Sequence, residues 1–100
     1  MMARFDVFRS KVGGGYLLDC QADVLEHLNT RFCIPLMPPE EAPLAGERLN
    51  PEFLVAGEHV RMVTQFAASV PVRELGPLVD NLVGEHSAII NAVDMLTTGY

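Results

Sequence analysis

Residues 84–97, close to the end of the chain, form the one long segment with the periodicity of a helix. The side chains that recur at helical spacing fall on one stripe, namely His86, Ile89, Ile90, Val93 and Leu96. A helix of about 13 residues is marginal on its own, so it must dock this stripe on the rest of the molecule. The sequence therefore predicts one C-terminal helix packed on the structure that the preceding residues form.

The preceding residues have the pattern of short antiparallel strands. Residues 4–9 and 16–21 alternate in polarity on either side of a glycine-rich loop, Gly13-Gly14-Gly15. This arrangement is typical of a β-hairpin, because glycine reaches the positive φ values that hairpin loops need. Residues 51–55 and 59–66 are a second pair of strand-like runs joined by a short turn, which predicts a second hairpin.

Two further extended segments are expected, at 30–36 and at 68–72. In the first of them, Pro35 lacks a backbone donor, which predicts that it lies at a sheet edge or a bend. The dipeptide Gly76-Pro77 indicates a turn after the second. Residues 37–50 have no clear periodicity, so we expect a functional or mobile loop there, with mobility favoured and short strand-like pieces within it.

The two ends of the predicted helix differ in how well they are capped. Asp80 or Asn81 offers an N-cap, and Glu85 complements the positive N-terminus. Asp94 opposes the negative C-terminus at a cost of roughly 0.3–1 kcal/mol, and no Lys or Arg follows Arg73 to offset it. A charge placed against a local rule is a candidate for function, although a tolerated surface carboxylate is the commoner explanation.

The composition fits one domain spanning residues 1–100. Apolar residues make up 49% and charged residues 20%, which excludes disorder, and no apolar run reaches the roughly 20 residues that cross a membrane. The first residues lack the apolar core of a signal peptide, so we expect a cytoplasmic protein. A net charge of −6 with one Lys argues against direct, phosphate-led binding of nucleic acid.

The sequence offers no evident catalytic constellation and no metal site. His27, His59 and His86 are isolated from one another, and Cys20 and Cys33 lack the paired spacing of a zinc site. Both cysteines occur in strand-like runs, where we expect buried, reduced thiols. We therefore expect no metal, no cofactor and no catalytic residue, although the residues alone do not exclude an enzyme.

Four features follow one another along nearly the whole chain. They are Asp19-Cys20-Gln21-Ala22-Asp23, Arg31-Phe32-Cys33-Ile34-Pro35-Leu36, Ala68-Ser69-Val70-Pro71-Val72 and a C-terminal helix with glycine next to last. In this order and spacing they resemble the CcdB family, the toxins of ccd toxin–antitoxin modules. The resemblance implies a mainly β fold, with an SH3-like barrel, an antiparallel sheet extension and one C-terminal helix at about 84–97, assembled as a homodimer.

The resemblance also implies a function and its residues. Such a toxin is no enzyme: it binds the A subunit of DNA gyrase, traps the cleaved-DNA complex and blocks replication, and a CcdA-like antitoxin neutralises it. By position, gyrase binding is implied for Asp94, Thr98, Gly99 and Tyr100. Antitoxin binding is implied for Val24, Leu25 and Asp94.

The tail departs from the family pattern, because Thr98-Gly99-Tyr100 stands where the familiar sequence is Trp-Gly-Ile. Either Tyr100 takes over as the aromatic anchor or poisoning is weakened, and we expect activity of altered strength. Two alternatives stay open. One is an endoribonuclease of the MazF/Kid family, which shares the barrel but needs an Arg-rich, acid-paired site that the first strands do not show. The other is a non-toxic homologue that only binds antitoxin.

Overall fold

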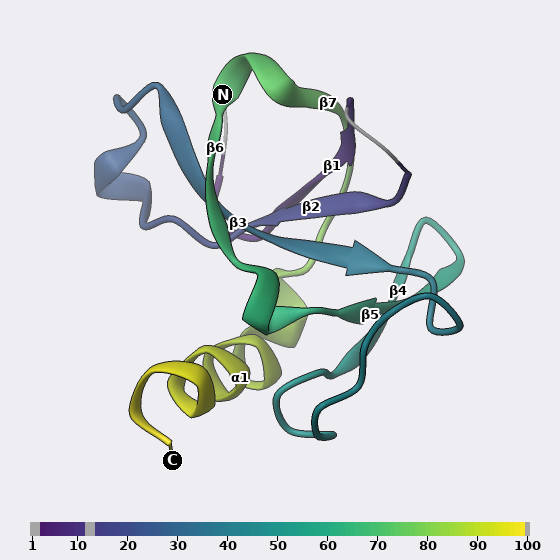
Figure 1. Ribbon diagram of the computed structural model, residues 1–100. Coiled ribbons are helices and arrows are strands. Elements are labelled where there is room, and N and C mark those ends of the chain that lie inside the picture. Colours follow the sequence, from purple (N-terminus) through teal and green to yellow (C-terminus); the bar gives the residue numbers. More distant parts are fainter. Residues whose placement is uncertain (1–2, 12–13, 100) are drawn as a thin grey trace.

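The computed structural model describes residues 3–11 and 14–99, which form a curled antiparallel sheet in the shape of a half-barrel with one C-terminal helix, α1 (His86–Thr98) (Figure 1). The strands of this part of the chain are β1 (Asp6–Ser10), β2 (Tyr16–Asp19), β3 (Thr30–Met37), β4 (Glu52–Val55), β5 (Glu58–Met62), β6 (Ala68–Pro71) and β7 (Leu75–Asn81). Their order is β4-β5-β3-β2-β1-β7, and β6 pairs separately with β3. The predicted SH3-like barrel with a C-terminal helix is confirmed.

Both predicted hairpins are present. In the first, β1 pairs with β2 so that Val7 lies opposite Leu18, and in the second, Phe53 of β4 lies opposite Val60 of β5. Gly15 of the first loop has a φ of +88°, and a Cβ there would lie 2.8 Å from the carbonyl oxygen of Leu36. This position therefore requires glycine both for its conformation and for its space.

The second strand of the second hairpin is shorter than the sequence predicts. β5 ends at Met62, and Thr64–Phe66 form a 3₁₀ turn, η2, instead of continuing the strand. The hydroxyl of Thr64 donates a hydrogen bond to the carbonyl of Leu49, and the side chain is buried. A threonine hydroxyl that bonds to backbone offers the chain an alternative to the ladder, which the alternation of polarity does not reveal.

β3 is the strand that organises the sheet. Its first half, Thr30–Cys33, pairs with β6, whereas Leu36 and Met37 pair with β5. Pro35 lies between these two segments, and its carbonyl accepts a hydrogen bond of 3.0 Å from the N–H of Val63. The proline thus occupies the place where the strand changes neighbours on one side, but on the other side it pairs with Leu17 of β2, so it does not lie at the predicted sheet edge.

The predicted turn at Gly76-Pro77 is wrong, because both residues lie within β7. In the pairing of β7 with β1, Leu78 lies opposite Phe8 and Leu75 opposite Ser10, so Gly76 and Pro77 together face Arg9. This is a β-bulge, in which the extra residue lets proline enter an edge strand. A Cβ on Gly76 would lie 2.3 Å from the carbonyl oxygen of Arg9, which explains the glycine.

Residues 38–50 contain no strand, which corrects the expectation of strand-like pieces, and polar side chains fasten this loop. Nη1 of Arg61 donates to the carbonyls of Pro39 and Ala42 at 3.0 and 3.2 Å. Nδ2 of Asn50, a buried residue, donates to the carbonyl of Met62 at 3.1 Å. The loop is therefore attached to the β4–β5 hairpin at several points.

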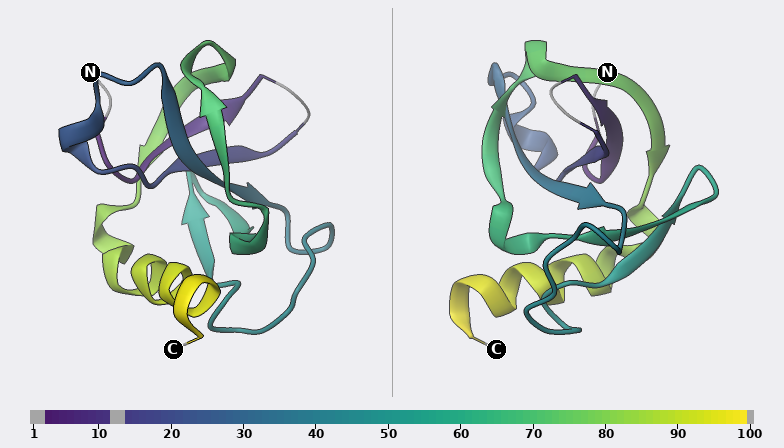
Figure 2. Two further views of the ribbon diagram at one scale, coloured as in Figure 1. Left: turned by 60° about the vertical axis from the view of Figure 1, so that its left-hand side comes forward. Right: turned by 45° about the vertical axis from the view of Figure 1, so that its right-hand side comes forward.

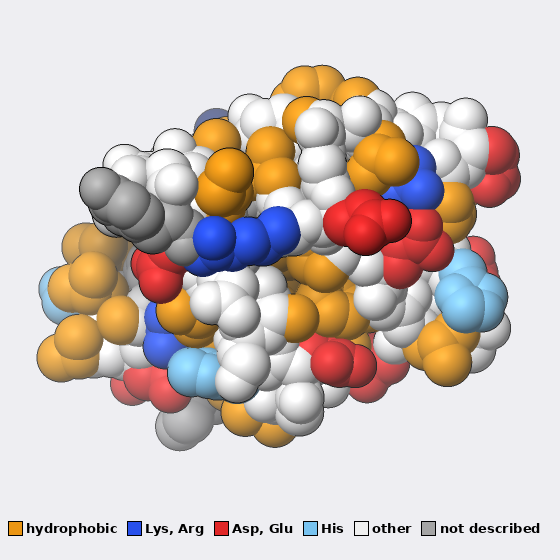
Figure 3. Space-filling model, turned by 90° about the horizontal axis from the view of Figure 1, so that it is seen from below, with side chains coloured by type: hydrophobic (Ala, Val, Ile, Leu, Met, Phe, Trp, Pro, Cys, Tyr) orange, Lys and Arg blue, Asp and Glu red, His pale blue; other side chains and the backbone are white. Residues whose placement is uncertain are grey.

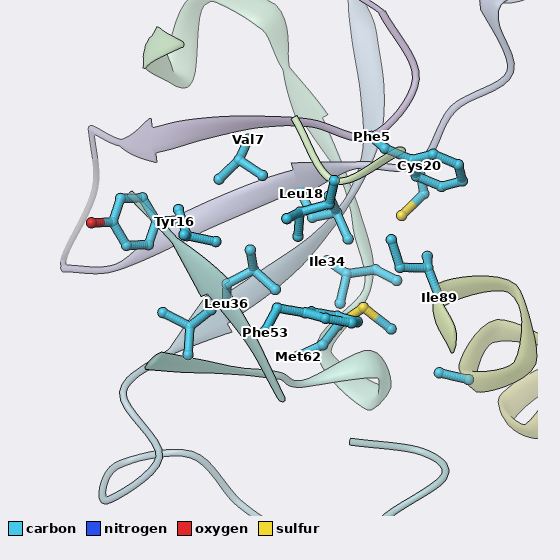
Figure 4. Close-up of a cluster of buried hydrophobic side chains, with 14 residues drawn as sticks. Phe5, Val7, Tyr16, Leu18, Cys20, Ile34, Leu36, Phe53, Met62 and Ile89 are labelled. Carbon is cyan, nitrogen blue, oxygen red and sulfur yellow. The ribbon is translucent and has the colours of Figure 1, made fainter. Parts of the chain in front are cut away.

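The two ends of the strand order are joined by side chains. Oδ2 of Asp80, in β7, accepts a hydrogen bond of 3.0 Å from the N–H of Ala56, in the turn between β4 and β5. Within the sheet, the hydroxyl of Tyr16 donates to Glu58 at 2.7 Å and so links β2 to β5. The interior that these contacts enclose is filled by apolar side chains from six strands and from α1 (Figure 4).

α1 begins two residues later than the predicted start at residue 84, because Val83–Glu85 form a 3₁₀ turn, η4. The prediction that Asp80 or Asn81 caps the helix is wrong, because the N-cap position of α1 is Glu85, whose side chain makes no capping hydrogen bond. Oδ1 of Asn81 instead accepts a hydrogen bond of 2.8 Å from the N–H of Val83, the first residue of η4. Ile89 and Ala92 are fully buried against the barrel, and Ala88, Ile90 and Val93 pack beside them.

Candidate partner-binding sites

The second half of α1 runs past the sheet. Leu96, which the helical stripe places in the core, is 43% exposed, and the neighbouring Met95 is exposed too. The last buried side chain of the helix is Ala92, and four residues of helix add about 6 Å of length. Figure 2 shows this end of α1 projecting beyond the barrel. The prediction that Leu96 is buried is therefore wrong, because the stripe is longer than the surface it packs on.

The end of α1 is tied together by its own side chains. The hydroxyl of Thr98 donates to the backbone carbonyl of Asp94 at 2.7 Å, and that of Thr97 donates to Val93 at 3.0 Å. Gly99 has a φ of +81°, and its N–H donates to the carbonyl of Met95 at 3.1 Å. This is a left-handed cap, which ends the helix and turns the chain away from its axis.

The carboxylate of Asp94 is exposed one turn before this cap, and the last turn contains no basic side chain. Thr98 and Gly99 are exposed as well, whereas Tyr100 lies outside the described residues. Figure 3, which shows the face that carries α1, has hydrophobic side chains between polar and charged ones. The exposed apolar side chains at this end of the helix are candidates for contact with a partner protein.

The second candidate surface is the 3₁₀ turn η1 (Asp23–Leu25), between β2 and β3. Val24 is 80% exposed and Leu25 is 42% exposed, which is unusual for aliphatic side chains in an ordered turn. Leu28 and Phe32 are also exposed nearby in the sequence. Neither was predicted as a contact residue, because local polarity does not show which apolar side chains of a loop and a strand stay exposed.

The structure brings Asp94, Thr98 and Gly99 together at the end of α1, and it places Val24 and Leu25 in a different part of the molecule. The views in Figures 1 and 2 agree that η1 and the end of α1 are well separated. Asp94 therefore shares a surface with the tail, and a single chain presents two distinct sets of exposed apolar residues.

Behind η1 lies a buried ion pair. Nη2 of Arg31 is 2.7 Å from Oδ2 of Asp19, Nε of Arg31 donates to the same oxygen at 2.8 Å, and both side chains are fully buried. Burial raises the pKa of the Asp19 carboxyl, and the hydrogen bond from Arg31 opposes the rise. A pair so enclosed is out of reach of a substrate, and its role is structural.

Cys20 and Cys33 are free and buried, as predicted. Burial raises the pKa of each thiol to about 12, so neither is a thiolate at neutral pH. The three histidines are exposed, and the ring of His86 meets that of Phe5 edge-on at 5.4 Å. Within residues 3–11 and 14–99, no three His, Cys, Asp or Glu side chains are placed to hold a metal ion.

No helix in the described part of the chain is long and apolar enough to cross a membrane. Comparison with a protein-family model identifies this curled sheet with its C-terminal helix as that of a toxin of a toxin–antitoxin system. A family model described as CcdB protein matches residues 4–99, and the chain belongs to the CcdB family.

Two solved structures share the fold. One is an endoribonuclease in complex with its cognate antitoxin from mycobacterial species, with a TM-score of 0.80 and 12% identity over 100% of this chain and 99% of that one. The other is the Mycobacterium tuberculosis toxin MazF-mt6, with a TM-score of 0.72 and 14% identity over 89% of this chain and 92% of that one. At such identities the likeness is one of fold.

Proposed function

We propose that this protein is a homodimeric toxin, acting in the cytoplasm, that binds the A subunit of DNA gyrase and traps the cleaved-DNA complex. The match of the CcdB family model to residues 4–99 carries the proposal. The toxin blocks replication and performs no catalysis of its own. A CcdA-like antitoxin neutralises it.

The gyrase contact is formed by Asp94, Thr98, Gly99 and Tyr100. Gly99 is in the left-handed conformation, and the exposed side chains of Met95 and Leu96 lie beside this cap. An aromatic side chain at such a place is the kind of anchor that carries much of the energy of an interface. Tyr100 then serves as the aromatic anchor in place of the tryptophan of the Trp-Gly-Ile tail of the family.

Symmetry and charge support the same target. A homodimer presents two copies of one surface related by a twofold axis, which matches a symmetric pair of gyrase A subunits. The net charge of −6 complements a partner surface that is basic because it holds DNA.

The antitoxin contact is formed by Val24 and Leu25, with Asp94 as a further contact at the end of α1. Val24 and Leu25 project into solvent from η1, and burying such side chains under a partner is favourable by about 25 cal/mol for each Å² of apolar area. The structural neighbour that carries its cognate antitoxin supports a partner of this kind.

The shared fold supports the alternative that the protein is an endoribonuclease, but the ion pairs of the described residues are poorly suited to RNA cleavage. Asp19 and Arg31 are fully buried. Arg61 pairs with Glu52 at 2.7 Å and also bonds to two loop carbonyls, so its guanidinium is already engaged. General acid–base catalysis needs titratable groups within reach of the substrate.

A DNA-cleavage assay tests the proposal. Purified gyrase, ATP and supercoiled plasmid are incubated with the intact protein, with a variant lacking residues 98–100, and with Leu54→Ser as a control. Leu54 is exposed on β4 and belongs to neither η1 nor α1, so its substitution should leave the fold and the activity intact. We expect linear DNA with the intact chain and with Leu54→Ser, and none with the truncated chain.

Other results separate the alternatives. Cleavage of RNA by the purified intact protein, without linear DNA, would support the endoribonuclease. Antitoxin binding without either activity would identify a non-toxic homologue. Equal amounts of linear DNA from intact and truncated chains would leave gyrase poisoning in place but contradict the role of the tail.

A further inference from the structure

The turn η1 lies between strands and is held by side chains. The β2–β3 ladder stops where η1 begins: the N–H of Cys20 donates to the carbonyl of Phe32 at 2.8 Å, but the carbonyl of Cys20 faces Nε of Arg4 at 3.5 Å. The N–H of Phe32 is therefore available to another acceptor. A three-residue 3₁₀ turn has little stability of its own. The position of its exposed Val24 therefore depends on contacts between the turn and the rest of the molecule.

The side-chain amide of Gln21 makes these contacts through both its oxygen and its nitrogen. Its Oε1 accepts a hydrogen bond of 3.0 Å from the N–H of Phe32, and its Nε2 donates to the carbonyl of Leu25 at 2.9 Å. The side chain is buried. One amide thus joins the last residue of η1 to the backbone of β3, and both of its partners are main-chain atoms.

Gln21 is itself anchored in the barrel. Its N–H donates to Oδ1 of Asp19 at 3.0 Å, while Oδ2 of Asp19 receives the buried guanidinium of Arg31. At the other end of the turn, Oδ1 of Asp23 accepts a hydrogen bond of 2.8 Å from the N–H of Arg4. The turn is consequently connected to the fully buried ion pair through Gln21 and to the start of β1 through Asp23.

We propose that Gln21 is a positioning residue for the antitoxin surface: it holds η1 so that Val24 and Leu25 are preorganised for the partner. This inference rests on the proposed function, because it takes these two side chains as the antitoxin contact. Binding to a turn that is already ordered is tighter, because no conformational entropy is lost in ordering the turn. Gln21 touches no partner and acts only through the two side chains that η1 displays.

The test compares Gln21→Met with Gln65→Met in binding to a purified CcdA-like antitoxin, measured by calorimetry. Methionine matches glutamine in length and removes both hydrogen bonds. Gln65 accepts a hydrogen bond from Asn50 and lies in η2, so its substitution is a matched loss of a glutamine elsewhere. We expect Gln21→Met to weaken binding about tenfold, the effect of losing one to two hydrogen bonds, and Gln65→Met to leave it within about twofold.

Two readouts distinguish positioning from a general loss of stability. Hydrogen exchange should accelerate in Gln21→Met at the N–H groups of Leu25, Glu26 and Leu28, which bond within the turn, while those of β5 keep their protection. In a chain that already carries Val24→Ala and Leu25→Ala, adding Gln21→Met should cost less than twofold in affinity.

Three results would overturn the inference. A full tenfold cost of Gln21→Met in the doubly substituted chain would show that Gln21 acts elsewhere, and unchanged affinity with accelerated exchange would show that order in η1 does not matter. If Val24→Ala and Leu25→Ala do not weaken antitoxin binding, the proposed contact fails first and the inference fails with it.

Discussion

Oδ2 of Asp19 lies 2.7 Å from Nη2 of Arg31, and neither side chain has any exposed surface. The same distance separates Arg61 and Glu52, of which Glu52 is 46% exposed. The two pairs have the same N–O distance but differ in their exposure to solvent. The cost of removing one charge should therefore differ strongly between them, because water compensates an exposed partner and leaves a buried one uncompensated.

The first prediction compares Asp19→Asn with Glu52→Gln in urea unfolding at pH 7. Asp19→Asn should lower the free energy of unfolding by about 3–5 kcal/mol, since it leaves the Arg31 guanidinium charged and buried. Glu52→Gln should cost at most about 1 kcal/mol. Similar losses in both variants would contradict the assignment of Asp19 and Arg31 as a structural ion pair.

This ion pair also shows which contacts near the site cannot be predicted from the sequence. The segment Asp19 to Asp23 is recognisable as a motif, but nothing in its letters says that Asp19 meets Arg31 or that Gln21 bridges Phe32 and Leu25. These contacts join residues 4 to 12 positions apart through a bend at the end of a ladder. Only the register of β2 on β3 determines them.

The fold was more predictable than the limits of its elements. Alternating polarity and glycine predicted both hairpins, and the helical stripe predicted α1. The errors lie where tertiary contacts override local signals: Gly76-Pro77 forms a bulge against Arg9, and Thr64 turns away from the ladder to bond with Leu49. Leu96 has helical spacing but no surface to pack on.

The second prediction concerns alkaline pH. The thiols of Cys20 and Cys33 have a pKa of about 12 in the fold against 9.0 for an ordinary cysteine. Below about pH 9 both states are protonated and stability is unaffected. Between about 9 and 12 only the unfolded chain ionises, so stability should fall as pH rises, by about 1.4 kcal/mol per thiol for each pH unit.

Unfolding free energies measured at several alkaline pH values check this slope. The pKa of Tyr16 is also raised, by its hydrogen bond to Glu58 and by burial, so its ionisation also lowers stability as pH rises. The cysteine variants are therefore made in a chain that carries Tyr16→Phe. In that chain, the double substitution Cys20→Ala and Cys33→Ala should reduce the slope of the unfolding free energy against pH, even though it lowers overall stability. An unchanged slope would mean that the thiols do not ionise differently in the two states.

The third prediction is a pair of glycine substitutions. Gly76→Ala should destabilise the fold by about 1–3 kcal/mol, because its Cβ would lie 2.3 Å from the carbonyl oxygen of Arg9 and would push β7 away from β1. Gly84→Ala has nothing within 4 Å of its Cβ and should change stability by less than about 1 kcal/mol. Thermal unfolding of both variants measures the difference, and equal stabilities would refute the bulge as a packing constraint.

The fourth prediction links the cap of α1 to the proposed poisoning of gyrase. Gly99 has a φ of +81°, which costs a β-branched residue more than about 1 kcal/mol and which asparagine tolerates better than other side chains. Gly99→Val should therefore change the backbone conformation of the cap, whereas Gly99→Asn should preserve it. Because this end of the helix is exposed, neither change should alter the unfolding of the barrel by more than about 1 kcal/mol.

Linear DNA in the gyrase assay is the readout for these two variants. We expect Gly99→Val to lower its yield at least tenfold and Gly99→Asn to retain most of it, since a displaced anchor loses both its packing and its desolvation. Thr97→Ala, which removes a hydroxyl contact to Val93 in the same turn, controls for general fraying of the helix end. Full activity of Gly99→Val would mean that the direction of the tail is not what gyrase recognises, and equal losses in all three variants would point to the order of the last turn instead.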